Sequence, residues 1–415
     1  SDEDSKLKRI AAALTADPRT GDIADSEEIG DRLREAGDLS GAFSPYQKAL
    51  AIGVARFGNA HPVVARIQRK LGGTYLARGD FLQAERCFHI ALEIDKQSYG
   101  GNDSRVAADL SNLATVYEYR GDLVHARQLQ EEVLAIRRQV QGEEHPDTLT
   151  SMNNLAGTLW NQGDLAGARA LQEHVLAIRR RVLGEEHPDT LTSASNLAAT
   201  LSNQGDVASA RALQEHVLAI RRRVQGDLHP DTLASMNNLA RTIQVMGDLS
   251  GARALQDRVL AVSRGALGEE HPDTLTAMNN LGGTLQAQGD FESARALQED
   301  VLALSRGALG EEHPDTLAAM NNLASTLRAQ GDLTGALALQ ERALLAYRRV
   351  LGTEHPNVAF VMSNLAATHK ARGEVDQARA LYKEVISTLE RSLGPEHPST
   401  KSAQRNLLSI DQELR

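Results

Sequence analysis

A period of 42 residues runs along the chain and constrains its fold more than any other feature. Aligning residues 145–186 with residues 187–228 gives 33 identical positions out of 42. Repetition at a fixed step of this size is typical of a solenoid, in which each unit packs mainly on its neighbours. We therefore expect nine repeated units instead of separate globular domains. The period is marked by the dipeptide His-Pro, which begins at His61, His145, His187, His229, His271, His313, His355 and His397.

Each unit is predicted to be a pair of helices. Apolar residues such as Leu197, Leu201, Val217 and Leu218 follow helical spacing on both sides of a Gly-Asp dipeptide. Proline fits the first position of a helix, where its missing N–H is harmless, so His-Pro should open the first helix. The glycine of Gly-Asp, or of Gly-Glu at Gly373, permits a left-handed turn that ends this helix, and the acidic residue can then cap the second. A second row of glycines is expected to end the second helix. Aromatic residues make up only 3% of the chain, which disfavours a sheet.

A small residue is predicted at the seam between the two helices of every unit. Each second helix carries an alanine at the same place, and the first helix carries glycine or alanine after a leucine or isoleucine. Small residues let antiparallel helices approach closely while the flanking large residues fill the seam. The nine alanines are Ala42, Ala84, Ala126, Ala168, Ala210, Ala252, Ala294, Ala336 and Ala378.

The segments HPDTL, NNLA, QGDL and LG recur in this order within the units. This pattern resembles the tetratricopeptide repeat, and its 42-residue step is similar to the repeats of kinesin light chains over residues 22–415. The resemblance implies an all-α, right-handed superhelical solenoid of nine helix pairs in residues 22–396. We expect capping helices in residues 1–21 and 397–415.

Charge and composition exclude several classes of function. The chain has 55 acidic and 45 basic residues, a net charge of -10, which is the reverse of a nucleic-acid-binding surface. It has no apolar run near the roughly 20 residues that span a bilayer, so we expect no membrane contact. A single cysteine, Cys87, favours a reducing compartment, and we expect a cytoplasmic protein.

Catalysis, metals and cofactors are not expected. Eight of the 13 histidines belong to His-Pro. Their copies are one unit apart, and packed helices lie about 8 to 10 Å between axes, which is too far for a shared zinc ion. The sequence contains no GxSxG, GxxxxGK[ST] or GxGxxG motif. We therefore predict a protein that is not an enzyme.

The resemblance also implies where a ligand would bind. In tetratricopeptide repeats the first helices line a concave groove, and the residue before the Leu-Ala or Leu-Gly pair faces it. This residue is asparagine in eight successive units, and its amide can pair as donor and acceptor with the backbone of an extended peptide. The alternative is that each amide bonds to a neighbouring helix and fixes the geometry of the repeat. The predicted amides are those of Asn112, Asn154, Asn196, Asn238, Asn280, Asn322, Asn364 and Asn406, doubled by Asn153, Asn237, Asn279 and Asn321.

Specificity is expected to come from positions around these amides that vary between nearly copied units. They include Trp160, Arg241, Arg328 and Lys370. Basic residues that could attract carboxylates cluster at the two ends of the array: Arg66, Arg69 and Lys70 at one end, Lys401 and Arg405 at the other.

Two functional hypotheses follow. The first is a non-catalytic module that binds an extended peptide or protein segment in an asparagine-rich groove. The alternative is that the chain is the sensor or autoinhibitory arm of a larger effector, with an NTPase or protease domain upstream of Ser1.

Overall fold

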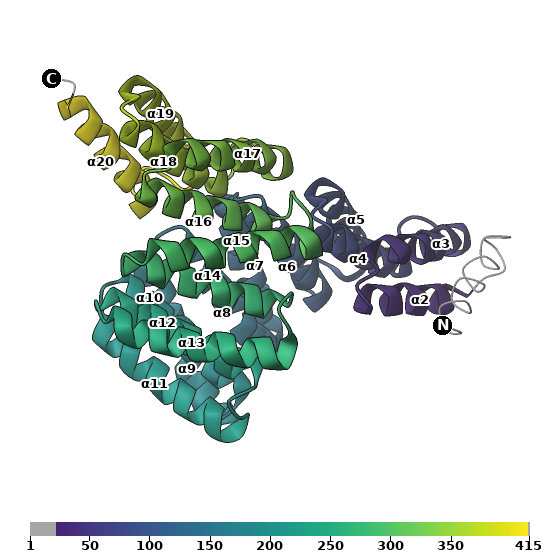
Figure 1. The fold of residues 1–415 in the computed structure, drawn as a ribbon. Helices are drawn as coiled ribbons and strands as arrows, with labels where there is room; N and C mark the ends of the chain where they lie inside the picture. Colours follow the sequence, from purple (N-terminus) through teal and green to yellow (C-terminus); the bar gives the residue numbers. More distant parts are fainter. Residues whose placement is uncertain (1–21, 414–415) are drawn as a thin grey trace. The chain divides into compact units, whose positions relative to one another are not determined.

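The computed structural model describes residues 22–413, so the capping helix predicted in residues 1–21 lies outside the described part. Within that part every regular element is a helix, and the predicted all-α solenoid of nine helix pairs followed by one closing helix is confirmed (Figure 1). The helices are α2 (Ile23–Glu35), α3 (Leu39–Phe57), α4 (Pro62–Ala77), α5 (Phe81–Tyr99), α6 (Ser104–Tyr119), α7 (Leu123–Gln141), α8 (Pro146–Asn161), α9 (Leu165–Leu183), α10 (Pro188–Asn203), α11 (Val207–Val224), α12 (Pro230–Val245), α13 (Leu249–Leu267), α14 (Pro272–Ala287), α15 (Phe291–Leu309), α16 (Pro314–Gln330), α17 (Leu333–Leu351), α18 (Pro356–Ala371), α19 (Val375–Ser392) and α20 (Pro398–Glu413).

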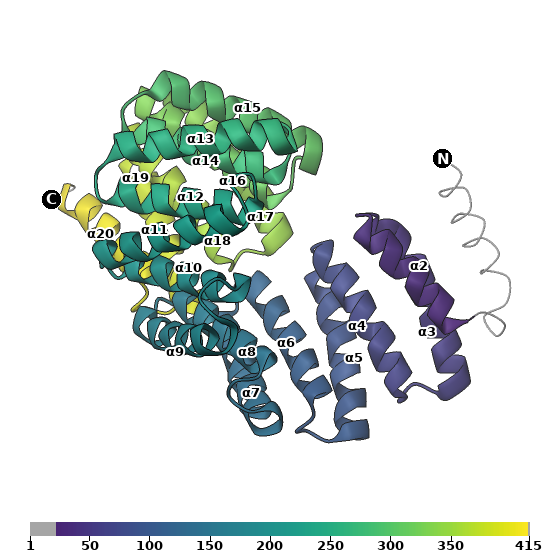
Figure 2. The same ribbon diagram turned by 90° about the horizontal axis from the view of Figure 1, so that it is seen from below.

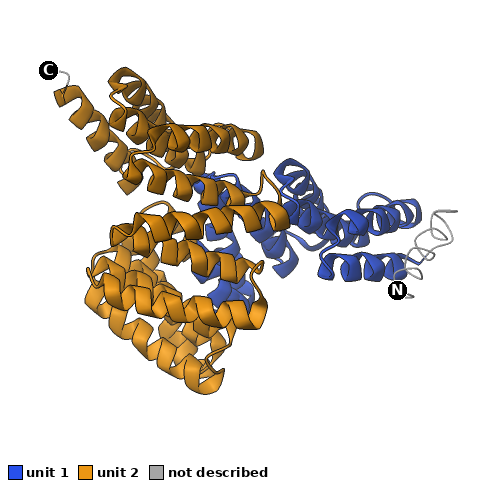
Figure 3. Cartoon of the chain, in the orientation of Figure 1, with its two compact units in different colours: residues 1–155 blue, residues 156–415 orange. Residues whose placement is uncertain are grey.

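The chain divides into two compact units, residues 1–155 and residues 156–415, with the boundary inside α8 (Figure 3). In the first unit, α2 to α7 each pack against the next helix along the chain, and Figure 2 shows α2 to α6 lying side by side. In the second unit the same neighbour packing runs from α9 to α20. First helices of successive pairs also touch, as α12 touches α14 and α14 touches α16.

The histidine of each His-Pro is the N-cap of its helix. Its Nδ1 atom accepts the backbone N–H of the residue two positions on, at 3.0 to 3.2 Å in all eight copies. At the degenerate copy, a carboxylate oxygen of Asp103 accepts the N–H of Arg105 in the same way, at 2.8 Å. The helix starts that we predicted from Pro are confirmed, but the imidazole supplies the capping bond, a role that the sequence analysis did not assign.

The two predicted rows of glycines end the helices as expected. All eighteen have a positive φ, between 75° and 94°, where a side chain would be strained. The aspartate after the first glycine row caps the second helix, as Asp164 does by accepting the N–H of Gly167 at 2.9 Å. The prediction is wrong at Glu374, which makes no capping bond. Its longer side chain meets the Nδ1 atom of His369 at 2.6 Å instead.

The predicted seam is confirmed, since all nine alanines are completely buried. The small residue of the first helix faces a position four residues after the seam alanine. At Gly30 an added Cβ atom would lie 2.5 Å from the ring of Tyr46, and at Gly72 it would lie 2.7 Å from the ring of Phe88. Glycine therefore stands where the second helix brings an aromatic ring to the seam.

Candidate functional site

The predicted amides all lie on first helices. Asn112, Asn153 and Asn154 belong to the first compact unit, on α6 and α8. In the second unit, the amides of α10, α12, α14, α16 and α18 form what we call the amide column, namely Asn196, Asn237, Asn238, Asn279, Asn280, Asn321, Asn322 and Asn364. Most of these side chains are exposed or half-buried, whereas Asn321 is only 3% exposed.

Part of the amide column braces neighbouring repeats. The Nδ2 atom of Asn322 donates to the Oδ1 atom of Asn279 at 3.4 Å, which links α16 to α14. Asn364 donates in the same way to Asn321 at 3.1 Å, which links α18 to α16. The structural alternative for these amides therefore holds at the end of the column that lies toward the C-terminus.

The other end of the column has unused hydrogen-bonding capacity. The Oδ1 atom of Asn237 is buried and has no partner among the described residues. Asn280 occupies the place of Asn322 one unit earlier, yet its side chain forms no hydrogen bond within the described part of the chain. A buried acceptor without a partner costs free energy, so this part of the column favours a donor from elsewhere.

Three pockets open at equivalent places, where a second helix lies between two first helices. One of about 440 Å³ lies among α4, α5 and α6 and includes Asp95. One of about 190 Å³ lies among α12, α13 and α14 and includes Ser263, and we call it the Ser263 pocket. One of about 180 Å³ lies among α16, α17 and α18 and includes Tyr347. These three residues hold the same position in the 42-residue period.

We call this the junction position, and it varies more than its surroundings. Its residues are Gly53, Asp95, Arg137, Arg179, Arg221, Ser263, Ser305, Tyr347 and Leu389. The sequence analysis missed it because it sought binding residues on first helices only. A signal was nevertheless present. Wherever the junction residue is arginine, the residue 14 positions later is serine, and where it is Ser263 or Ser305 that later residue is Ala277 or Ala319.

The arginines fill their own junctions. The Nη1 atom of Arg221 donates to the carbonyl oxygen of Asp231 at 2.8 Å and to the Oγ atom of Ser235 at 2.7 Å. Arg179 makes the equivalent bonds at 3.1 and 2.9 Å, and Arg137 makes them at 2.7 and 2.8 Å. Burial lowers the pKa of these three guanidinium groups, and the nearby aspartate opposes it. The serine 14 residues on is thus the arginine's hydrogen-bond acceptor.

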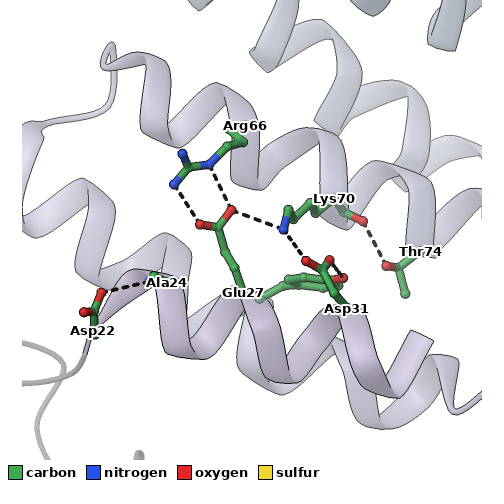
Figure 4. A network of polar contacts seen from close by, with 8 residues as sticks. Asp22, Ala24, Glu27, Asp31, Arg66, Lys70 and Thr74 are labelled. Carbon is green, nitrogen blue, oxygen red and sulfur yellow. Dashed lines mark hydrogen bonds and ion pairs between the residues drawn. The ribbon is translucent and has the colours of Figure 1, made fainter. Parts of the chain in front are cut away.

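The predicted basic cluster of the first unit is not a free positive surface. Arg66 makes two hydrogen bonds to the carboxylate of Glu27, and Lys70 donates to Asp31 at 2.6 Å (Figure 4). The expectation changes because α2 places these acids beside α4, a neighbourhood that spacing within one helix does not reveal.

Arg69 is paired as well. Its Nη1 atom lies 2.5 Å from the carboxylate of Asp95 and 3.1 Å from that of Asp109. Burial raises the pKa of Asp109 to about 7, and Arg69 opposes this shift. The cations of this cluster are therefore matched by carboxylates from α2, α5 and α6.

The cations of the second unit differ among themselves. Lys370 donates to Glu413 at 2.6 Å, and Lys401 lies 2.7 Å from Glu396. Arg405 lines an open pocket of about 530 Å³ together with Lys401. The side chains of Arg241, Arg328 and Arg405 form no hydrogen bond or ion pair with any described residue. Those three cations are available to a ligand.

Other candidate groups are now placed. The indole N–H of Trp160 is buried on α8 without a partner in the described part. Cys87 is buried, and burial raises the pKa of its thiol to about 11, so the thiolate nucleophile is scarce near neutral pH. Among residues 22–413, no three His, Cys, Asp or Glu side chains are grouped as a metal ion requires. None of the described helices is both long and apolar enough to cross a bilayer.

Comparison with known proteins identifies a related family. A model of the tetratricopeptide repeat matches seven overlapping segments that together run from residue 63 to residue 391. No curated protein matches the chain.

Several solved structures are also similar. A putative kinesin light chain of Podosopora anserina with nearly identical TPR-like repeats is 34% identical, covering 49% of this chain and 96% of that one, with a TM-score of 0.43. BtubC (BKLC) from P. vanneervenii is 23% identical, covering 64% and 94%, with a TM-score of 0.46. The apo form of RapI is 14% identical, covering 69% and 98%, with a TM-score of 0.52.

Proposed function

Because the chain belongs to the tetratricopeptide repeat family, we propose that it is a non-catalytic interaction module that binds an extended segment of another protein along the amide column. The observation that carries this proposal is the unpartnered Oδ1 atom of Asn237, which lies beside the unbonded side chains of Asn238 and Asn280. These amides offer donors and acceptors to a backbone of any sequence.

The spacing of the helices suits an extended ligand. An extended chain advances about 3.3 Å per residue, and packed helices lie about 8 to 10 Å apart. One amide would therefore meet about every third residue of the ligand, which leaves the side chains between for the junction pockets. Selectivity would arise at these pockets and at the unpaired cations Arg241 and Arg328.

The test compares two kinds of asparagine. We expect Asn238→Ala with Asn280→Ala to weaken the binding of extended peptides by about tenfold or more, because each lost hydrogen bond is worth about 0.5 to 1.5 kcal/mol. These changes should leave the melting temperature equal or higher, since neither amide braces a neighbour and alanine is the better helix former. Peptides selected from a random library on the wild-type chain serve as probes, and affinity is measured by titration.

The matched control is Asn364→Ala, which removes the donor to Asn321. We expect it to lower the melting temperature while the folded protein keeps its peptide affinity within about twofold. The proposal fails if the double variant binds the selected peptides as tightly as the wild type does.

A further inference from the structure

We propose that the Ser263 pocket binds a guanidinium group, presented by an arginine side chain of the bound segment. This inference rests on the proposed function for the source of the arginine, but the chemistry of the pocket stands separately. The repeats themselves provide the comparison, because in the preceding units an arginine of the chain occupies the same place.

The unit before the Ser263 pocket shows what a filled junction looks like. There the guanidinium of Arg221 is bound by the carbonyl oxygen of Asp231 and the hydroxyl of Ser235, and Arg221 is only 5% exposed. One period later, Ser263 stands in place of Arg221 and Ala277 in place of Ser235. Asp273 keeps the place of Asp231 at the start of the next first helix. The exchange removes the guanidinium and its serine acceptor together, and a pocket of about 190 Å³ lies at this junction.

The pocket lining offers hydrogen-bond acceptors. The side chain of Ser263 is 1% exposed, and its Oγ atom has no partner among residues 22–413. The Oδ1 atom of Asn237 also lines the pocket without a partner. Asp273 is the one ionisable residue of the lining, and it is an acid. A guanidinium has five N–H donors and no acceptor, so it matches this set, whereas a carboxylate would find an acid and unmatched acceptors.

The next junction shows why the Ser263 pocket is distinct. Ser305 and Ala319 repeat the same exchange one unit later. There, however, the equivalent of Asn237 is Asn279, whose Oδ1 atom already accepts the amide of Asn322. The acceptor that points to a ligand is thus free at the Ser263 junction and occupied at the following one.

The experiment uses Nα-acetyl-arginine amide as the probe and the corresponding citrulline compound as its uncharged isostere. Binding to the full chain is followed by ligand-observed NMR titration. We expect the arginine compound to bind about tenfold or more tightly than citrulline, because charge-assisted hydrogen bonds are the stronger ones. Replacing Ser263→Arg together with Ala277→Ser copies the Arg221–Ser235 pair, so this variant should fold normally and lose the site.

A charge-matched control separates filling the pocket from adding a positive charge. Ser305→Arg with Ala319→Ser makes the same exchange at the next junction and should leave arginine binding within about twofold of wild type. Equal binding of arginine and citrulline, or unchanged binding after the Ser263 exchange, would overturn the inference. Binding of selected peptides that lack arginine, with no arginine-amide site at Ser263, would also overturn it while the proposed function stands. Specific arginine binding in a chain that selects no peptide would support the pocket and refute the proposed function.

Discussion

At the scale of single residues, the histidine caps depend on protonation. A ring nitrogen that accepts a backbone N–H must be unprotonated, and each His-Pro histidine uses Nδ1 in this way. His397 is further constrained because its Nε2 atom lies 3.1 Å from the carbonyl oxygen of Asn161, within the second compact unit. This ring therefore has one defined neutral tautomer, with the proton on Nε2.

His397 makes stability depend on pH in a known direction. Burial lowers its pKa in the folded protein. The unfolded chain then takes up the proton first, so the contribution of His397 to stability is complete above its ordinary pKa of about 6.5 and falls as the pH drops. We expect the difference in unfolding free energy between wild type and His397→Asn to shrink from pH 7.5 to pH 5, measured by urea unfolding. A difference that grew toward acid would contradict this assignment.

At the scale of helices, the seam alanines set how closely the members of a pair approach. Ala210 is fully buried on α11, whereas Ala212 on the same helix is exposed. Ala210→Leu should destabilise the protein by about 1 to 3 kcal/mol through overpacking. Ala212→Leu makes the same chemical change on the other face and should stay within about 0.5 kcal/mol. Thermal unfolding of both variants checks this, and equal shifts would show that the leucine itself, not the seam, is responsible.

The sequence predicted what lies within a helix pair more completely than what lies between pairs. Helix starts, glycine turns and seam alanines follow from local spacing, and they were correct apart from the cap at Glu374. The acids that meet Arg66 and Lys70, and the bond from Asn364 to Asn321, depend on how one pair is rotated against the next. That rotation is not encoded in the period of any single helix. The junction position was visible only as a correlation between Arg221 and Ser235 and their equivalents.

At the scale of the whole molecule, the many histidines invite a metal test. Each His-Pro ring already uses its Nδ1 atom for a cap, and the copies are one unit apart. We therefore expect EDTA to leave the helical circular dichroism and the melting temperature unchanged, while added zinc should not raise the melting temperature. A chelator-dependent unfolding transition would show that metal binding contributes to the fold, since such binding adds directly to folding free energy.

The close likeness of the units has a consequence for how such a binding surface changes over generations. Residues 145–186 and 187–228 share 33 of 42 positions, and an arginine and its serine acceptor are only 14 residues apart. Recombination between misaligned copies of the gene would therefore insert or remove a complete junction, with its caps and seam intact. A new pattern of filled and open pockets could arise in one genetic event, without passing through a sequence that fails to fold.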